Sequence, residues 1–536
     1  MNARTWAIAC FCFFAVLPAA HAGHGFASDM LRLGIGFSEQ KKYDEAILCY
    51  NEALVFYNSK HEREQILYHR AGAHVCKMEY PAAIADFTAA LRLDPRDAKA
   101  YCYRATAYYW HGDFHQELAD ANEAIRLDPR MADAYMARGT AFEAMGNPRQ
   151  ALPDMDTAIR LKPGKEALSY VNRGKVHDDL GQLDLAMQDF AEALRIDPKN
   201  YLALTNIANC HFRTGDFDRT IAEYSAAIAV DPKNPLAYIG RGAIYQTLNK
   251  LDEALSDETT AISLSPHSAM ALTNRAAVYI ARQEFPKAVD DLDTAVLADP
   301  KYANAYYLRG LSDIGTNSPD KALDDFNEAI RLNFRGGSVF YERGCILDTK
   351  GDMDGAIRDY ASAIQADPKD TEAYEARGID FYKRHLWQKA IDDFTAVIRL
   401  NPKYEDIYTQ RADCHLSMGN NAKALDDYMQ AVREDGKSLT ARIDLSWFLA
   451  TCSDASLRNG VVALRYAQSA CDDSLWKDKY AIRAIAAAYA ETGDFASAQK
   501  CESLFLAQPG LTGHQIDLSN KRLSLYKEGK PWHIGD

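Results

Sequence analysis

Ten arginines of this 536-residue chain are each followed, sixteen residues later, by an aspartate. A guanidinium and a carboxylate can form a bidentate, charge-assisted pair, and arginine is also well suited to binding anionic ligands. Where the arginine is replaced by Leu33, Leu445 or Ile485, the partner position lacks an acid; only Ile207 keeps one, Glu223. The two positions vary together, which favours ten structural ion pairs over ten copies of a ligand site. The pairs are Arg70 with Asp86, Arg104 with Asp120, Arg138 with Asp154, Arg173 with Asp189, Arg241 with Asp257, Arg275 with Asp291, Arg309 with Asp325, Arg343 with Asp359, Arg377 with Asp393, and Arg411 with Asp427.

The sequence contains none of the short motifs that usually supply catalytic or metal chemistry. It has no glycine-lysine phosphate loop, no G-x-S-x-G, no H-E-x-x-H and no C-x-x-C. His111 and His115 have the i, i+4 spacing of helical metal ligands, but Gly112 and Asp113 between them predict a turn. We therefore expect a non-enzymatic protein with no metal site and no cofactor.

Length and composition indicate a folded chain that is larger than one core. A single hydrophobic core rarely extends beyond about 250 to 300 residues. Hydrophobic residues make up 48% of the chain and charged residues 25%, which is ordinary for a globular protein. The formal net charge of −14 argues against binding to nucleic acid or to an anionic membrane, since both need a basic face. The expected partner is another protein or an extended peptide.

A repeat of 34 residues organises nearly the whole chain. Apolar spacings of three and four residues on both sides of a turn predict two amphipathic helices per repeat, and a proline ends the second helix. The period has a single slip of one residue, between Pro163 and Pro198. The closing position of the repeat is occupied by Pro95, Pro129, Pro163, Pro198, Pro232, Pro266, Pro300, Phe334, Pro368, Pro402 and Gly436.

The repeat resembles the tetratricopeptide repeat, whose pattern places a small residue at position 8, an aromatic at 11, alanine at 20 and 27, and proline at 32. Gly139, Phe142, Ala151, Ala158 and Pro163 match it in one unit. Fourteen such units imply an all-α, right-handed superhelical solenoid. We expect units 1 to 12 over residues 23–438, two divergent units over 439–511, and a capping helix with a tail over 512–536. The closing units also look like the end of a recurrent group of exported bacterial repeat proteins.

In this family, positions 2, 5, 6, 9, 12 and 13 of each first helix line a concave groove, which is where the resemblance implies peptide binding. Asparagine recurs at position 6, and a row of amides can hold a peptide backbone with little regard to its sequence. A solvated polar face remains the alternative reading of these asparagines. The candidate groove residues are Asn172, Lys175, Asn206, Asn209, Arg213, Asn274, Tyr307, Tyr341, Tyr109 and Trp110.

The first 22 residues read as a signal peptide, with a short basic start, a 12-residue apolar stretch from Trp6 to Leu17 and a small-residue end at Ala22. We therefore expect a periplasmic or secreted protein with no membrane insertion after cleavage. Nine cysteines would follow the signal, most of them as buried thiols. A disulfide between Cys452 and Cys471 is the one bridge that the spacing leaves open.

Together these features predict a non-catalytic scaffold that binds extended partner segments in its groove. Two alternatives stay open: a self-assembling structural solenoid, since open solenoid ends can stack, and a polysaccharide-binding groove in which aromatics stack on sugar rings.

Overall fold

The structure is a computed structural model that describes residues 22–534 except 58, 165 and 405. The predicted signal peptide lies outside the described residues, apart from Ala22, where the first helix begins. The described chain is helical throughout and contains no strand, so the predicted all-α class is confirmed. Within this range, no helix is both long enough and apolar enough to cross a membrane.

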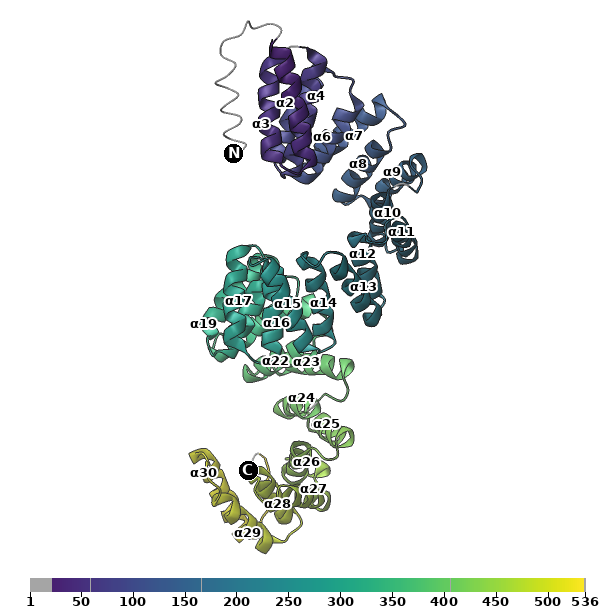
Figure 1. The fold of residues 1–536 in the computed structure, drawn as a ribbon. Coiled ribbons are helices and arrows are strands. Elements are labelled where there is room, and N and C mark those ends of the chain that lie inside the picture. The colour runs from purple at the N-terminus through teal and green to yellow at the C-terminus, as the bar shows by residue number, and fades with distance from the viewer. Residues whose placement is uncertain (1–21, 58, 165, 405, 535–536) are drawn as a thin grey trace. The chain divides into compact units, whose positions relative to one another are not determined.

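The chain divides between Pro266 and His267 into two compact units. Each unit is a stack of antiparallel helix pairs in sequence order, coloured from purple to teal in the first unit and from teal to yellow in the second (Figure 1). We call the two members of each pair its first and second helix. The first unit contains α2 (Ala22–Glu39), α3 (Tyr43–Phe56), α4 (Lys60–Cys76), α5 (Tyr80–Leu93), α6 (Ala98–His111), α7 (Phe114–Leu127), α8 (Ala132–Ala144), α9 (Pro148–Leu161), α10 (Ala167–Asp179), α11 (Leu183–Ile196), α12 (Tyr201–Arg213), α13 (Phe217–Val230), α14 (Pro235–Thr247) and α15 (Leu251–Leu264).

The second unit repeats this arrangement and ends in one additional helix. It contains α16 (Ala269–Ala281), α17 (Phe285–Ala298), α18 (Ala303–Gly315), α19 (Pro319–Arg331), α20 (Ser338–Thr349), α21 (Met353–Ala366), α22 (Thr371–Lys383), α23 (Trp387–Leu400), α24 (Ile407–Ser417), α25 (Asn421–Glu434), α26 (Leu439–Thr451), α27 (Gly460–Asp473), α28 (Lys479–Glu491), α29 (Phe495–Leu506) and α30 (Gly513–Lys527).

Local sequence signals define the limits of these helices. Asp97 caps the start of α6, where its carboxylate accepts hydrogen bonds from the backbone N–H groups of Lys99 and Ala100. Gly112 ends α6 in the left-handed conformation, with φ at 85°, and Asp113 then caps the start of α7. The two helices can therefore reverse direction within two residues, which separates His111 from His115.

Small residues let the helices of each pair pack closely. In the second hairpin, Ala71 and Ala83 are completely buried and contact Phe87, which is 3% exposed. Burying one such phenylalanine contributes about 1.5–3 kcal/mol. Each hairpin alone has too little apolar surface for a core, so stability comes from stacking on its neighbours.

The C-terminal end of the second unit departs from the regular repeat. A short 3-10 helix, Ala455–Leu457, occupies the extra residues between α26 and α27. The last helix, α30, begins with a complete capping box formed by Thr512 and Gln515, and Gly529 follows it with φ at 72°. The capping box and the terminal glycine expected from the sequence are both present.

Several first helices of consecutive hairpins contact each other in both units. Contacts join α2 to α4, α6 to α8, α8 to α10 and α10 to α12 in the first unit, and α16 to α18 and α26 to α28 in the second. Within the described residues, consecutive second helices make no comparable contacts. We call the surface lined by the first helices of a unit its first-helix surface, and it is where the groove residues lie.

Candidate binding surface

The structure brings together all ten arginine and aspartate pairs. In each pair, the arginine Nε and Nη2 groups donate one hydrogen bond to each carboxylate oxygen, over distances between 2.5 and 2.9 Å. The aspartates are between 4% and 8% exposed. Each pair therefore joins the first helix of a hairpin to its own second helix.

The same arginines make a third hydrogen bond that the sequence analysis missed. Nη1 of Arg104 donates to Thr88, and Nη1 of Arg138 donates to Asn122, in both cases on the second helix of the preceding hairpin. The acceptor stands two residues after the position that the ladder aspartate takes in the preceding hairpin, which holds Cys49 before Arg70 and Glu223 before Arg241. Equivalent bonds join Arg70 to Asn51, Arg173 to Asp156, Arg241 to Ser225, Arg309 to Asp293, Arg343 to Asn327 and Arg411 to Thr395.

The electrostatics of the pairs point to a role in helix register. The hydrogen bonds that Arg104 donates to the Asp120 carboxylate raise the pKa of Arg104, while burial raises the pKa of Asp120 even though the guanidinium opposes that shift. In this pair, dehydration of the carboxylate therefore affects the pKa of Asp120 more than the neighbouring cation does. Such a pair adds little stability over apolar residues of similar size, yet it strongly favours one alignment of the helices.

Apolar and amide side chains lie one turn apart on three consecutive first helices of the first unit. Leu168, Leu202 and Leu236 are 53%, 49% and 59% exposed on α10, α12 and α14. Asn172 and Asn206 follow the first two leucines by four residues, so each shares a helix face with its leucine. Within the part of the chain described, neither asparagine side chain forms a hydrogen bond with the protein.

A tyrosine explains why the asparagine row is interrupted at Gly240, before it resumes along the sequence at Asn274. A Cβ atom at Gly240, the next position in the row, would overlap the ring of Tyr224. The Tyr224 hydroxyl donates a hydrogen bond of 2.6 Å to Oδ1 of Asn209. Tyr224 therefore fixes the Asn209 amide with its carbonyl oxygen occupied, which leaves the Nδ2 group as a donor.

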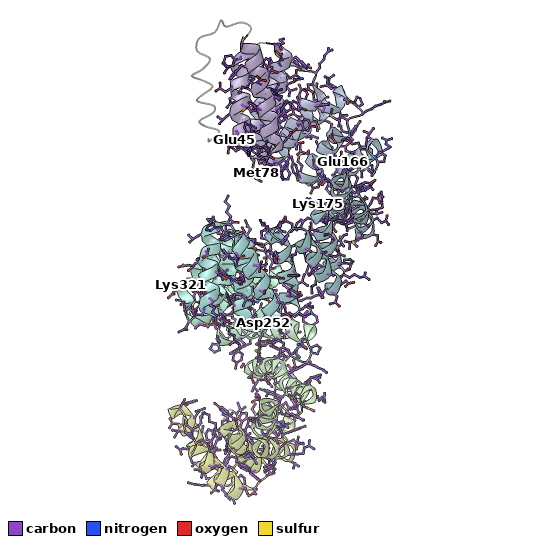
Figure 2. All side chains as sticks on the ribbon, viewed as in Figure 1. Glu45, Met78, Glu166, Lys175, Asp252 and Lys321 are labelled. Atoms are coloured by element: carbon purple, nitrogen blue, oxygen red, sulfur yellow. The ribbon has the colours of Figure 1, made fainter. Side chains whose placement is uncertain are left out.

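The two basic groove candidates are neutralised by acids on neighbouring repeats. Lys175, labelled in Figure 2, forms an ion pair of 2.8 Å with Glu143, and Arg213 pairs with Asp178. Each of these two groove candidates therefore has an acid from the preceding hairpin as its counter-ion. The aromatic candidates Tyr109 and Trp110 contact each other edge to face, with 5.1 Å between ring centroids, and Trp110 is 58% exposed.

The remaining candidates, Asn274, Tyr307 and Tyr341, belong to the second unit. Tyr307 stacks on Phe334 at 4.5 Å, so one face of its ring is already covered. Tyr341 is half-buried and packs near Tyr360, with 6.0 Å between the rings. The structure therefore places the groove candidates in two separate sets, one in each unit.

The first-helix surface of the second unit also carries half-buried acids. The Tyr428 hydroxyl donates a 2.5 Å hydrogen bond to Asp413. Burial, together with the charge of Asp413, raises the pKa of Asp444 to about 7. The first-helix surface of the second unit therefore carries two half-buried acids, Asp413 and Asp444.

The cysteines and histidines form no reactive or metal-binding group in the described residues. Cys452 and Cys471 are completely buried free thiols in different core clusters, so the bridge left open by their spacing is not formed. Cys452 packs against the preceding repeat, whereas Cys471 faces the core beneath α28. No group of three or more metal-ligating side chains occurs among the described residues.

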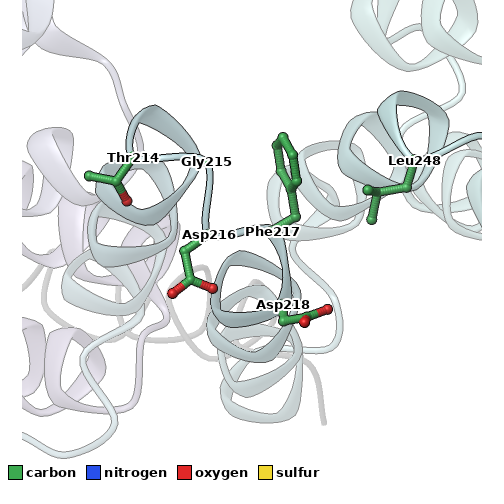
Figure 3. A pocket seen from close by; sticks show the side chains of 6 residues that line it. All are labelled: Thr214, Gly215, Asp216, Phe217, Asp218 and Leu248. Atoms are coloured by element: carbon green, nitrogen blue, oxygen red, sulfur yellow. The ribbon is translucent and has the colours of Figure 1, made fainter.

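One open pocket lies away from the first-helix surface. Thr214, Gly215, Asp216 and Phe217 form one side of it, at the turn between α12 and α13, and Leu248 closes the other side (Figure 3). Its lining comes from inter-helix turns and contains no nucleophile or histidine. It does not include any of the predicted groove residues.

Family comparisons agree with the repeat geometry. Profiles described as tetratricopeptide repeat match residues 78–132, 136–201, 179–244, 273–333, 337–370 and 375–438. The chain therefore belongs to the tetratricopeptide repeat family, whose fold is typical of protein-interaction scaffolds. No curated protein matches the chain.

Several known structures share parts of the fold. YrrB, described as a repeat protein with an unusual peptide-binding site, is 24% identical over 34% of this chain and 95% of its own, with a TM-score of 0.32. A repeat protein from Parabacteroides merdae is 24% identical over 46% of this chain and 97% of its own, with a TM-score of 0.33. The Cut9–Hcn1 complex covers 91% of this chain and 100% of its own at 14% identity and a TM-score of 0.43.

Proposed function

We propose that the protein is a non-catalytic interaction scaffold of an exported compartment, which binds extended partner segments on the first-helix surface of its first unit. The observation that carries this proposal is the double row of Leu168, Leu202 and Leu236 beside Asn172 and Asn206. Soluble monomers rarely expose apolar residues in a repeated row unless that row meets a partner.

The two rows suit different parts of an extended peptide. An asparagine amide donates and accepts hydrogen bonds, so it can pair with backbone C=O and N–H groups of any sequence. The leucines offer apolar contacts to side chains that point toward the scaffold. We therefore expect moderate affinity and a preference for segments with several apolar residues.

Libraries of displayed peptides test this binding surface. The intact chain should enrich peptides rich in apolar residues, and the double variant Leu202→Asp with Asn206→Ala should lose them. Leu185→Asp is the matched control, because Leu185 is 43% exposed on the second helix α11. Enrichment that survives in the double variant, or that fails equally in the control, would refute the proposed surface.

Export is tested separately. Residues 1–30 fused to a phosphatase reporter that works only outside the cytoplasm should give activity, and replacement of Leu17 by Arg should abolish it. Reporter activity that does not depend on the apolar stretch would contradict the exported location. Binding of a glycan array, or a mass that rises with concentration, would favour the two alternative functions.

A further inference from the structure

The chain's own C-terminal segment lies on the first helices of the last two hairpins. The backbone N–H of Ile534 donates a hydrogen bond of 2.8 Å to the carbonyl oxygen of Thr451, at the end of α26. His533 Nε2 lies 2.8 Å from a carboxylate oxygen of Glu491, at the end of α28. Residues 531–534 therefore occupy part of the first-helix surface, as an extended partner segment would. Figure 1 shows the C-terminal end beside these two helices.

The aromatic residue of this segment sits against a layered set of arginines and aromatics. The Trp532 and Trp447 ring centroids are 5.7 Å apart, and the guanidinium of Arg522 lies 5.8 Å from the Trp532 ring. Arg483 stacks on Trp447 at 4.2 Å. Guanidinium groups and indole rings attract each other through the ring quadrupole, so this surface is suited to an aromatic side chain.

Two buried hydrogen-bond donors at this surface have no acceptor while the segment is in place. Arg522 donates two hydrogen bonds to Glu502, of 2.9 and 2.7 Å, and its charge is compensated. Arg483 is different, because its buried Nε–H has no acceptor, and within the described residues no carboxylate lies within ion-pair distance of it. Burial and the neighbouring Arg522 cation lower the pKa of Arg483. The buried Trp532 Nε1–H also lacks an acceptor.

We propose that the surface formed by Trp447, Arg483 and Glu491 docks a short extended segment of a partner protein that carries an aromatic side chain and a nearby carboxylate. In the isolated protein, residues 531–534 cover this surface, and the partner segment displaces them when it binds. The partner must carry an aromatic side chain because Trp532 packs against Trp447 and Arg522 at this surface. The carboxylate requirement follows from the unpaired donor of Arg483, since a charged buried donor without an acceptor is unfavourable. This surface lies in the second unit and does not depend on the proposed peptide site of the first.

Fluorescence anisotropy with short peptides tests the proposal on the full chain. The probes are the free peptide EGKPWHI, which repeats residues 528–534, the same peptide with alanine in place of tryptophan, and a scan that places glutamate at each position in turn. The variant Trp532→Ala vacates the surface without shortening the chain. It should bind EGKPWHI at least tenfold more tightly than the unmodified chain does, and it should not bind the alanine peptide.

Arg483→Met in the Trp532→Ala background separates recognition from folding. At least one glutamate peptide should bind about tenfold more tightly than EGKPWHI, and Arg483→Met should remove that difference, so that the two peptides bind the variant equally. Hydrogen exchange of α26 and α28 should be the same with and without Arg483→Met, which shows that the surface is still folded. Leu202→Asp in the first unit should leave all of these affinities unchanged, so failure here is distinct from failure of the peptide site proposed above.

Three results would overturn the proposal. The unmodified chain and Trp532→Ala could bind EGKPWHI equally, which would mean that residues 531–534 do not compete for this surface. The second such result is that no glutamate peptide binds more tightly than EGKPWHI in a way that depends on Arg483. A dimer of the unmodified chain that is lost in Trp532→Ala would instead assign the segment to exchange between two copies.

Discussion

Replacing Arg309 by methionine is expected to cost more free energy of unfolding than replacing both Arg309 and its partner Asp325. Arg309 donates hydrogen bonds of 2.8 and 2.7 Å to Asp325 and one of 2.7 Å to Asp293. Asp325 is 5% exposed, so Arg309→Met leaves a carboxylate buried without its cation. Stranding one member of a buried pair costs about 3–5 kcal/mol.

The reverse substitution should be less damaging. Asp325→Leu leaves Arg309 with Asp293, whose side chain is 56% exposed and well hydrated, and the Arg309 side chain is itself 21% exposed. The expected loss is about 1–3 kcal/mol. The double variant removes both charges and fills their space with apolar atoms, so its stability should lie within about 1 kcal/mol of the unmodified chain.

Repeat proteins do not unfold in a single step, so the measurement must be local. Hydrogen exchange of α18 and α19 reports the opening free energy of this hairpin. Arg331→Met with Glu328→Leu on α19 is the matched control, because that pair is exposed and should cause no measurable change. If the losses of the single variants add in the double variant, the two side chains are not coupled and the ladder does not set helix register.

Three further outcomes are expected. Burial raises the pKa of Glu117 to about 8, so the folded state holds a proton that the unfolded state loses above about pH 4.5. Hydrogen exchange of α7 should therefore show that stability falls between pH 4.5 and 8. The variant Glu117→Gln should remove that fall. Cys452 and Cys471 should both react with an alkylating agent after unfolding without reductant, as intact-mass measurement would show, and a mass lacking both additions would contradict the free thiols. Hydrogen exchange of α4 and α6 should show that Gly72→Ala, in an open helical position, stabilises its helix by about 0.5–1 kcal/mol, whereas Gly112→Ala, at φ of 85°, destabilises by a similar amount; equal effects would refute the backbone argument.

The fold could be predicted because the sequence repeats the pattern of one helical hairpin many times. A 34-residue period, small residues where helices approach and proline after most second helices all specify one hairpin, and their recurrence across consecutive repeats makes chance agreement untenable. The ion pairs could be predicted for the same reason, since the chain itself contains repeats with and without the arginine.

The third bond, which eight of the arginines make, was missed, although the sequence contains a signal for it. Its acceptor stands two residues after the position of the ladder aspartate and is polar in most repeats. Before Ile207 and Leu445, where the arginine is absent, that position holds Ala191 and Met429. Only the structure shows that the polar residue faces the following arginine, because the contact joins two different hairpins.

The candidate surface was harder to predict because its properties depend on neighbouring hairpins. The sequence makes Lys175 and Arg213 groove candidates, but it does not show that acids of the preceding repeat pair with both. Position in the repeat specifies where a side chain lies on its own helix. It does not specify which charged side chains of the neighbouring hairpin lie beside it, because those residues vary from repeat to repeat.

This contrast separates structural residues from binding residues within one chain. A side chain that recurs in ten repeats has the same structural role in each of them. In the arginine ladder, that role is to align the two helices of a hairpin. A specific partner must instead distinguish one stretch of the array from another. We therefore expect recognition to depend on local features of the array, such as the leucine row of α10, α12 and α14 and the single Trp447 and Arg483 surface of the last hairpins. Substitutions at these departures should change binding while leaving the fold intact, whereas substitutions in the ladder should do the reverse.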